Sequence, residues 1–182
     1  MRKVGKILVP IDFSEESARA LRYALTLATE TKAELIALHV VEARSLRNYF
    51  MSSLAGLEDS PCMSDHSPII SIDALLREKT FDLSNFIGKT VQGTSPVKIT
   101  KKLRIGSLVE EVATTAQEEN VDLVVLELRK RFPFPDLAAL RLLKIVRGLP
   151  CPVLLDPPVA EEGRAPRRPL SIFQTTPDEN VA

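Results

Sequence analysis

The sequence has few cysteines, no excess of charge of either sign and no long apolar run, and each shortage excludes a class of protein. Cys62 and Cys151 are the two cysteines in 182 residues, which are too few for a disulfide framework and indicate a reducing compartment. The 24 basic residues balance 24 acidic ones, which argues against a general nucleic-acid or membrane binder. No apolar run approaches the roughly 18 residues that cross a bilayer. The first apolar run stops at Pro10 and Asp12, so we expect no signal peptide and a cytoplasmic location.

The apolar residues that are present gather in short runs, of which residues 121–128 are the most informative. This run lacks polar alternation from Leu123 to Leu126, which is typical of a strand buried on both faces in the middle of a parallel sheet. Ligands of open parallel sheets bind beyond the carboxyl ends of the strands. The segment at 127–136 is therefore the place to look for function, and it is basic, aromatic and broken by prolines.

Strands and helices are expected to alternate along the rest of the chain. One strand at 6–12 carries Asp12 at its end, and Ser14 then caps a helix. Ser107 and Glu110 match a capping box for a later helix. Further strands are predicted at 33–41, at 97–105 and at 152–155, and the alternation at 97–105 places that strand nearer the sheet edge. Further helices are predicted at 72 to 88 or 93, from 108, and from 137 to Gly148. We expect one domain at 1–158 with a long loop at 43–70, helical in part around 46–54, and a disordered tail at 159–182.

This order of elements resembles the universal stress protein family, and the chain is identified as a UspA-like member. The resemblance rests on Lys-Ile-Leu-Val-Pro-Ile-Asp at 6–12, Leu-His-Val-Val-Glu at 38–42, Gly106 before a helix, Val-Asp-Leu-Val-Val at 121–125 and Leu-Pro-Cys-Pro-Val-Leu at 149–154. It implies an α/β, Rossmann-like fold: one doubly wound domain with a five-stranded parallel sheet, order 3-2-1-4-5, and helices on both faces. It also implies a homodimer in which the last strands pair through Val153, Leu154 and Leu155.

Many members of that family bind ATP, and the resemblance assigns Asp12 to the nucleoside and the backbone of Val41 to the base. It also implies a glycine-rich phosphate loop after the fourth strand, but the sequence departs from that pattern. The first two glycine positions fall on Glu127 and Lys130, and no glycine occurs between residues 107 and 147. A carboxylate about 4 Å from a phosphate is repelled by about 4 kcal/mol at an effective dielectric of 20. We therefore expect that family-type ATP binding is lost and that there is no cofactor.

A basic triplet followed by aromatics marks the same segment as a possible partner surface. Exposed aromatics beside arginine favour binding surfaces, so we interpret the segment as a docking site for an acidic or phosphorylated protein. The residues are Arg129, Lys130, Arg131, Phe132 and Phe134. Two plainer interpretations stay open: both phenylalanines fold back onto the core, and Asp12 is a polar residue that ends a strand.

No catalytic constellation is recognisable in the chain. There is no serine or cysteine nucleophile with a matching histidine and acid, and Cys62, Asp65 and His66 lack the second cluster that a structural zinc requires. His39 is interpreted as a hydrogen-bonded core residue. The leading hypothesis is a non-catalytic stress-response or regulatory interaction module without nucleic-acid or membrane partners. The alternative is an ATP or AMP sensor that uses Asp12, Val41 and Lys130.

Overall fold

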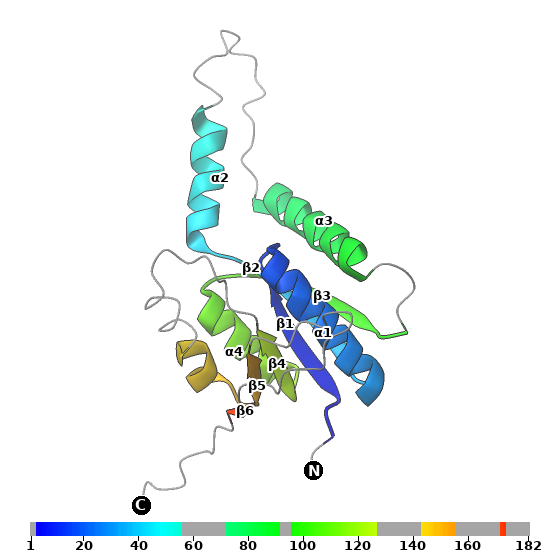
Figure 1. Cartoon of the computed structure of the whole chain (residues 1–182). Coiled ribbons are helices and arrows are strands. Elements are labelled where there is room, and N and C mark those ends of the chain that lie inside the picture. The colour runs from blue at the N-terminus through cyan, green and yellow to red at the C-terminus, as the bar shows by residue number, and fades with distance from the viewer. Residues whose placement is uncertain (1–2, 56–71, 92–95, 127–142, 156–171, 174–182) are drawn as a thin grey trace, which may run out of the picture.

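The structure is a computed structural model that describes residues 3–55, 72–91, 96–126, 143–155 and 172–173. A single sheet with strand order β3-β2-β1-β4-β5-β6 forms its centre (Figure 1). The first five strands are parallel to one another, and β6 is antiparallel to β5. The predicted parallel order 3-2-1-4-5 is therefore confirmed. The strands are β1 (Lys6–Ile11), β2 (Glu34–Val41), β3 (Ile99–Ile105), β4 (Leu123–Leu126), β5 (Val153–Leu155) and β6 (Ile172–Phe173).

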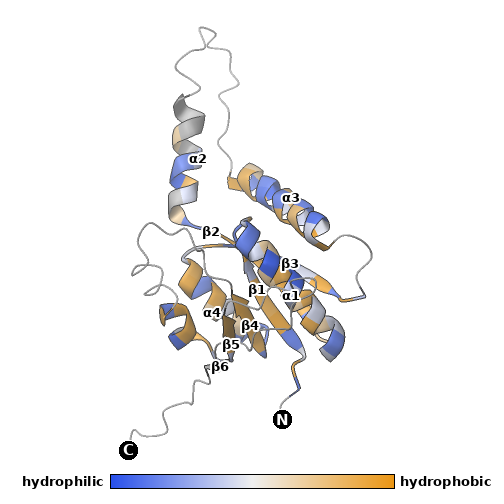
Figure 2. Cartoon of the chain, in the orientation of Figure 1, coloured by the Kyte–Doolittle hydropathy of each residue, from blue (hydrophilic) through white to orange (hydrophobic). Residues whose placement is uncertain are grey.

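The helices lie on both faces of the sheet, as predicted. On one face, α1 (Glu15–Thr31) and α3 (Ile72–Val91) bury Leu21 and Leu83 against the odd-numbered side chains of β1 and β2. On the other face, α4 (Leu108–Glu118) and the helical residues 143–148 bury Val112 and Ile145 against the even-numbered side chains. Figure 2 shows the hydrophobic strands between these two helical layers. The fold is a doubly wound α/β fold.

The central position of β4 and the edge position of β3 agree with their patterns of apolar residues. Val124 of β4 lies in one core cluster and Val125 in the other, so this strand is buried on both faces as its uninterrupted apolar run predicts. In β3, by contrast, all seven residues are half-buried or exposed. The alternation at 97–105 therefore predicted the edge position of β3 correctly.

The helical part that was expected around 46–54 in the long loop at 43–70 is confirmed, and it is longer than predicted. Residues Ala43–Ala55 form the helix α2, which points away from the sheet (Figure 1). This segment contains alanine, leucine, arginine and methionine but neither glycine nor proline, so its intrinsic helix propensity is high. None of its residues whose burial is described is buried, which explains why no strong apolar stripe marked it. Residues 56–70 lie outside the described residues.

Two smaller expectations are also corrected. Ser107 is the N-cap of α4, but its side chain makes no capping hydrogen bond, so the capping box with Glu110 does not form. Instead Glu111 folds back against Gly106, where an added Cβ would lie 2.6 Å from its Oε1 atom. The tail at 159–182 is not wholly disordered, because Ile172–Phe173 pairs with β5. The resemblance implies that the last strand of a second copy pairs with this edge of β5, and in the structure β6 lies there instead; an unpaired edge favours the addition of a strand. The other residues of that tail lie outside the described residues.

Candidate functional site

The turn that follows β1 places Asp12 at the carboxyl end of the sheet. The Oδ1 atom of Asp12 accepts a hydrogen bond from the backbone N–H of Ser14, with N and O 3.0 Å apart, and a short one from the Ser14 hydroxyl. Ser14 in turn accepts a hydrogen bond from the backbone N–H of Ser17 over 3.1 Å, which is the predicted cap of α1. The exposed Asp12 carboxylate is thus held in place by the start of the helix.

Phe13 occupies a conformation that aromatic residues rarely adopt. Its φ angle is 63°, in the left-handed region that costs about 1–2 kcal/mol for a residue other than glycine. Its ring lies 4.3 Å from that of His39 and 5.7 Å, edge to face, from that of Phe86. Such aromatic contacts contribute roughly 0.5–1.5 kcal/mol each beyond their burial and so offset the strain. No signal in the sequence indicated this role, since nothing local distinguishes Phe13 from a core residue.

His39 connects the turn to β2. Its Nδ1 atom lies 2.8 Å from the carbonyl oxygen of Ile11, and because a carbonyl only accepts, Nδ1 carries the proton and donates. Burial lowers the pKa of the His39 imidazole, and the positive charge of Lys79 lowers it further, whereas Asp12 opposes the shift. The hydrogen bond predicted for His39 is confirmed, and the residue is half-buried.

Val41, the second residue assigned to a nucleotide by resemblance, lies at the end of β2. Its side chain is 2% exposed, and its carbonyl oxygen accepts a hydrogen bond from the backbone N–H of Gly106 over 3.2 Å. Its backbone is therefore engaged by the loop that joins β3 to α4. Asp12 and Val41 are both at the carboxyl edge of the sheet, as expected, and each already has an internal partner.

The remaining predicted site residues lie outside the described residues. These are Lys130 of the nucleotide hypothesis and the docking residues Arg129, Arg131, Phe132 and Phe134, together with Cys62, Asp65 and His66. Within the described part of the chain, no group of three or more His, Cys, Asp or Glu residues is placed to hold a metal ion. No helix of that part is long and apolar enough to cross a membrane.

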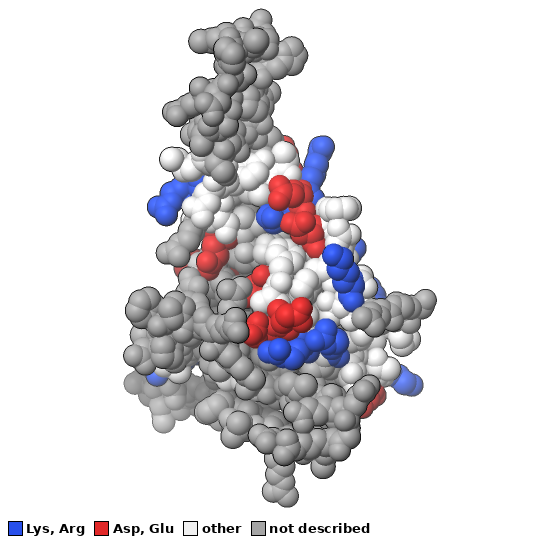
Figure 3. Space-filling model, turned by 45° about the horizontal axis from the view of Figure 1, so that its top comes forward, with Lys and Arg blue, Asp and Glu red and all other residues white. Residues whose placement is uncertain are grey.

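Acidic and basic side chains on the described surface form ion pairs with each other and do not gather into separate acidic and basic patches. On α3, Lys79 lies 2.9 Å from Asp82 and 3.0 Å from Glu78, and these hydrogen bonds raise its pKa. On the opposite face, Glu119 bridges Lys6 and Lys102. Figure 3 shows acidic and basic side chains next to one another in the same way. Such exposed pairs stabilise by only about 0–1 kcal/mol each.

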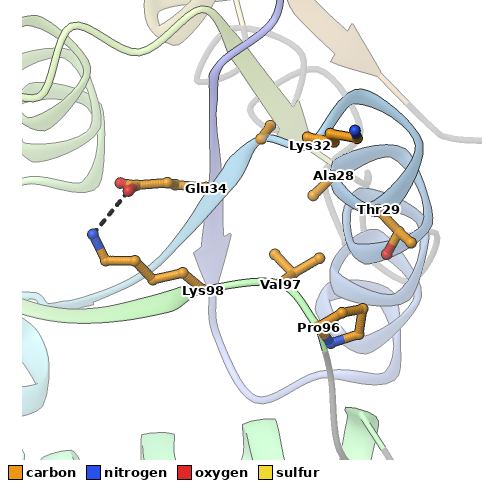
Figure 4. Close-up of a pocket in the computed structure, with 8 residues that line it drawn as sticks. Ala28, Thr29, Lys32, Glu34, Pro96, Val97 and Lys98 are labelled. Atoms are coloured by element: carbon orange, nitrogen blue, oxygen red, sulfur yellow. Dashed lines mark hydrogen bonds and ion pairs between the residues drawn. The ribbon is translucent and has the colours of Figure 1, made fainter.

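A shallow hollow lies at the opposite end of the sheet. It has a volume of about 300 Å³ and lies between the end of α1 and the segments that begin β2 and β3. Figure 4 shows Val97 and Ala28 beside it, with Lys98 paired to Glu34 over 2.8 Å. Because parallel sheets bind ligands at the carboxyl ends of their strands, this hollow at the amino ends is not the candidate site.

Comparison with known proteins places this geometry in a family. The family model described as "Universal stress protein family" matches residues 3–157, which covers most of the chain and all five parallel strands. The chain belongs to the universal stress protein family. The resemblance stated from the sequence is thus confirmed at the level of the family, and the outcome for its ATP loop stays a prediction because that loop lies outside the described residues.

Relatives within the family agree on the fold. "Universal stress protein MJ0577" of Methanocaldococcus jannaschii is 28% identical over 125 residues, which are 66% of this chain and 74% of the relative. A structure of MJ0577 superposes with a TM-score of 0.61 at 20% identity and covers 85% of this chain and 96% of its own. UspA from Lactobacillus plantarum gives a TM-score of 0.60 at 19% identity and covers 86% and 99%. A universal stress protein in complex with cAMP gives 0.51 at 18% identity and covers 85% and 97%.

Proposed function

We propose that this chain is a non-catalytic stress-response or regulatory interaction module that has lost the ATP binding of its family. One observation carries the proposal: no glycine occurs between Ser107 and Arg147. Glycines let the backbone N–H groups of a phosphate loop approach the oxygens and adopt positive φ angles. Glu127 and Lys130 stand at the first two of those positions, and a carboxylate there repels the phosphates.

The two site residues that the structure describes, Asp12 and Val41, support the same proposal. Asp12 accepts two hydrogen bonds from Ser14, and the Val41 carbonyl accepts one from Gly106. A nucleotide that displaced one of these hydrogen bonds would gain less free energy than one that bonded to an unpaired group. These internal hydrogen bonds support structural roles for Asp12 and Val41.

The proposed interaction surface is the basic and aromatic segment Arg129–Lys130–Arg131 with Phe132 and Phe134, and its proposed partner is an acidic or phosphorylated protein. Arginine and lysine supply charge-assisted hydrogen bonds to carboxylates and phosphates. We expect that replacement of the three basic residues by serine abolishes capture of the partner. Unchanged capture would contradict this part of the proposal. A homodimer through Val153, Leu154 and Leu155 of β5 belongs to the same proposal.

Titration calorimetry with Mg-ATP at low salt tests the loss of ATP binding. We expect no saturable heat and no shift of the melting temperature up to millimolar ATP. A matched variant, E127G/K130G, restores the first two glycines and removes the carboxylate, and we expect it to bind ATP more tightly than the native chain. Saturable binding of the native chain at micromolar ATP would overturn the proposal.

The second candidate function is an ATP or AMP sensor that uses Asp12 and Val41 with Lys130 in place of the glycines. It is favoured by the relative in complex with cAMP and by the exposed position of Asp12 at the carboxyl edge of the sheet. If the native chain binds the nucleotide, this candidate requires that Asp12→Ala and Lys130→Ser each weaken the binding. The variant Asp73→Ala on the exposed start of α3 provides the control.

A further inference from the structure

The outer edge of β5 is occupied by a distant segment of the same chain. At one edge β5 pairs with β4 in parallel, and at the other it pairs with β6 in antiparallel orientation. The register of the second pair places Val153 opposite Phe173 and Leu154 opposite Ile172. This strand from the tail therefore covers the edge that the proposed dimer requires (Figure 1).

The geometry of β5 shows which backbone groups this edge offers. The backbone N–H of Val124 in β4 donates to the carbonyl oxygen of Pro152 over 3.0 Å, so the even-numbered residues of β5 direct their backbone groups toward β4. Because these directions alternate along a strand, Val153 and Leu155 direct theirs toward the outer edge. Opposite Val153, the N–H of Phe173 must face β5, and that of Ile172 must face away from it.

The same edge accepts only one strand at a time. An unpaired edge is a template for another chain, and a second copy of β5 related by a two-fold axis would also arrive in antiparallel orientation. It would need the N–H and C=O groups of Val153 that β6 faces. Prolines at 150, 152, 157 and 158 leave little other edge to use, so the two partners exclude each other.

We propose that β6 acts as a removable cover of the β5 edge, so that the chain is monomeric while Ile172–Phe173 is docked and dimerises through β5 when it is released. This inference rests on the proposed β5 dimer and adds its regulation. With only two residues, β6 forms few backbone hydrogen bonds, and a second copy can displace it when the protein concentration is high. The tail would thereby set the concentration at which the module assembles.

Two proline variants of the full-length chain separate docking of β6 from other effects of proline. Phe173→Pro removes the N–H that faces β5, whereas Ile172→Pro removes one that faces away and keeps the pairing. We expect light scattering at micromolar concentration to give the monomer mass of 20.1 kDa for the native chain and for Ile172→Pro. For Phe173→Pro we expect twice that mass.

A third variant tests whether the dimer uses the β5 edge. Leu155→Pro removes an outward N–H from β5, and the double variant Leu155→Pro/Phe173→Pro should return to the monomer mass, with an unchanged far-ultraviolet circular dichroism spectrum as the check on folding. If the native chain is a dimer and Leu155→Pro dissociates it, the proposed covering role of β6 is wrong, whereas the proposal of a dimer through β5 stands. A monomeric Phe173→Pro variant, or dimers of both single proline variants, would also overturn it. Calorimetry with Mg-ATP is independent of all these results.

Discussion

A few side chains fix the turn at the end of β1, where the candidate site lies. Asp12 and Ser14 close the turn through their hydrogen bonds, and Phe13 keeps its left-handed backbone because its ring packs on His39. His39 holds the carbonyl of Ile11 at the same time. The sequence predicted the roles of Ser14 and His39 because caps and buried histidines follow local rules. It did not predict Phe13, whose conformation depends on rings from β2 and α3.

Stability should depend on pH through His39. Its folded-state pKa is lowered, so the unfolded chain binds the proton more readily. The stability that neutral His39 contributes is therefore present above its unfolded pKa of about 6.5 and is lost as pH falls through the folded pKa. We expect the free energy of unfolding in urea to fall as the pH drops below about 6.5.

The variant His39→Asn isolates that contribution. Asparagine keeps an N–H donor for the Ile11 carbonyl and does not titrate, so the fall with decreasing pH should be smaller than in the native chain. His66→Asn removes the other histidine and should leave the fall unchanged. An equal pH dependence of the native chain and His39→Asn would contradict this role.

Helix α3 is held against the sheet by the buried residues on one of its faces. Leu75, Leu83 and Ile87 are its buried residues, and they cover the odd-numbered side chains of β1 and β2. The opposite face carries the exposed ring of Phe81, whereas the half-buried Lys79, which is paired with Asp82, lies on the same side of the helix as Leu75 and Leu83. Helical spacing of apolar residues predicted the helix, but it did not show which of them turn inward, because Phe81 looks as apolar in the sequence as Leu83.

Two truncations on α3 should therefore differ strongly in cost. Leu83 is 1% exposed and Phe81 is 67% exposed. We expect Leu83→Ala to lower the free energy of unfolding by about 2–5 kcal/mol, because it removes buried surface and leaves a cavity. Phe81→Ala, the matched control, should change it by no more than about 0.5 kcal/mol. Chemical denaturation measures both, and similar losses for the two variants would show that α3 packs differently.

The whole molecule is held by contacts between segments that are far apart in the sequence. The Oδ2 atom of Asp122 accepts hydrogen bonds from the backbone N–H groups of Gly5 and Lys6 over 2.9 and 3.1 Å. The backbone N–H of Asp122 donates to the carbonyl of Lys6 over 3.0 Å. These bonds fix the start of β1 beside the start of β4, at the centre of the sheet. They thus fix the place where the two halves of the doubly wound fold meet.

Loss of this contact should destabilise the whole domain. We expect Asp122→Ala to lower the free energy of unfolding by about 2 kcal/mol, because two backbone donors lose a charged acceptor. Asp122→Asn keeps a neutral oxygen acceptor at the same place and should cost about half as much. Both are measured by denaturation in urea near neutral pH. A native-like stability of Asp122→Ala would show that water replaces the carboxylate at no cost.

The sequence by itself determined the family resemblance, through it the order of the five parallel strands, and the cap of α1. Local patterns determined which segments form strands and helices: uninterrupted apolar runs for β1, β2 and β4, alternation for β3, and a serine before the first helix. Only the tertiary structure decided the left-handed Phe13, the internal partner of Val41 and the pairing of β6 with β5. Each of these depends on contacts between residues distant in sequence. Local periodicity carries no information about which edge or ring a segment meets after folding.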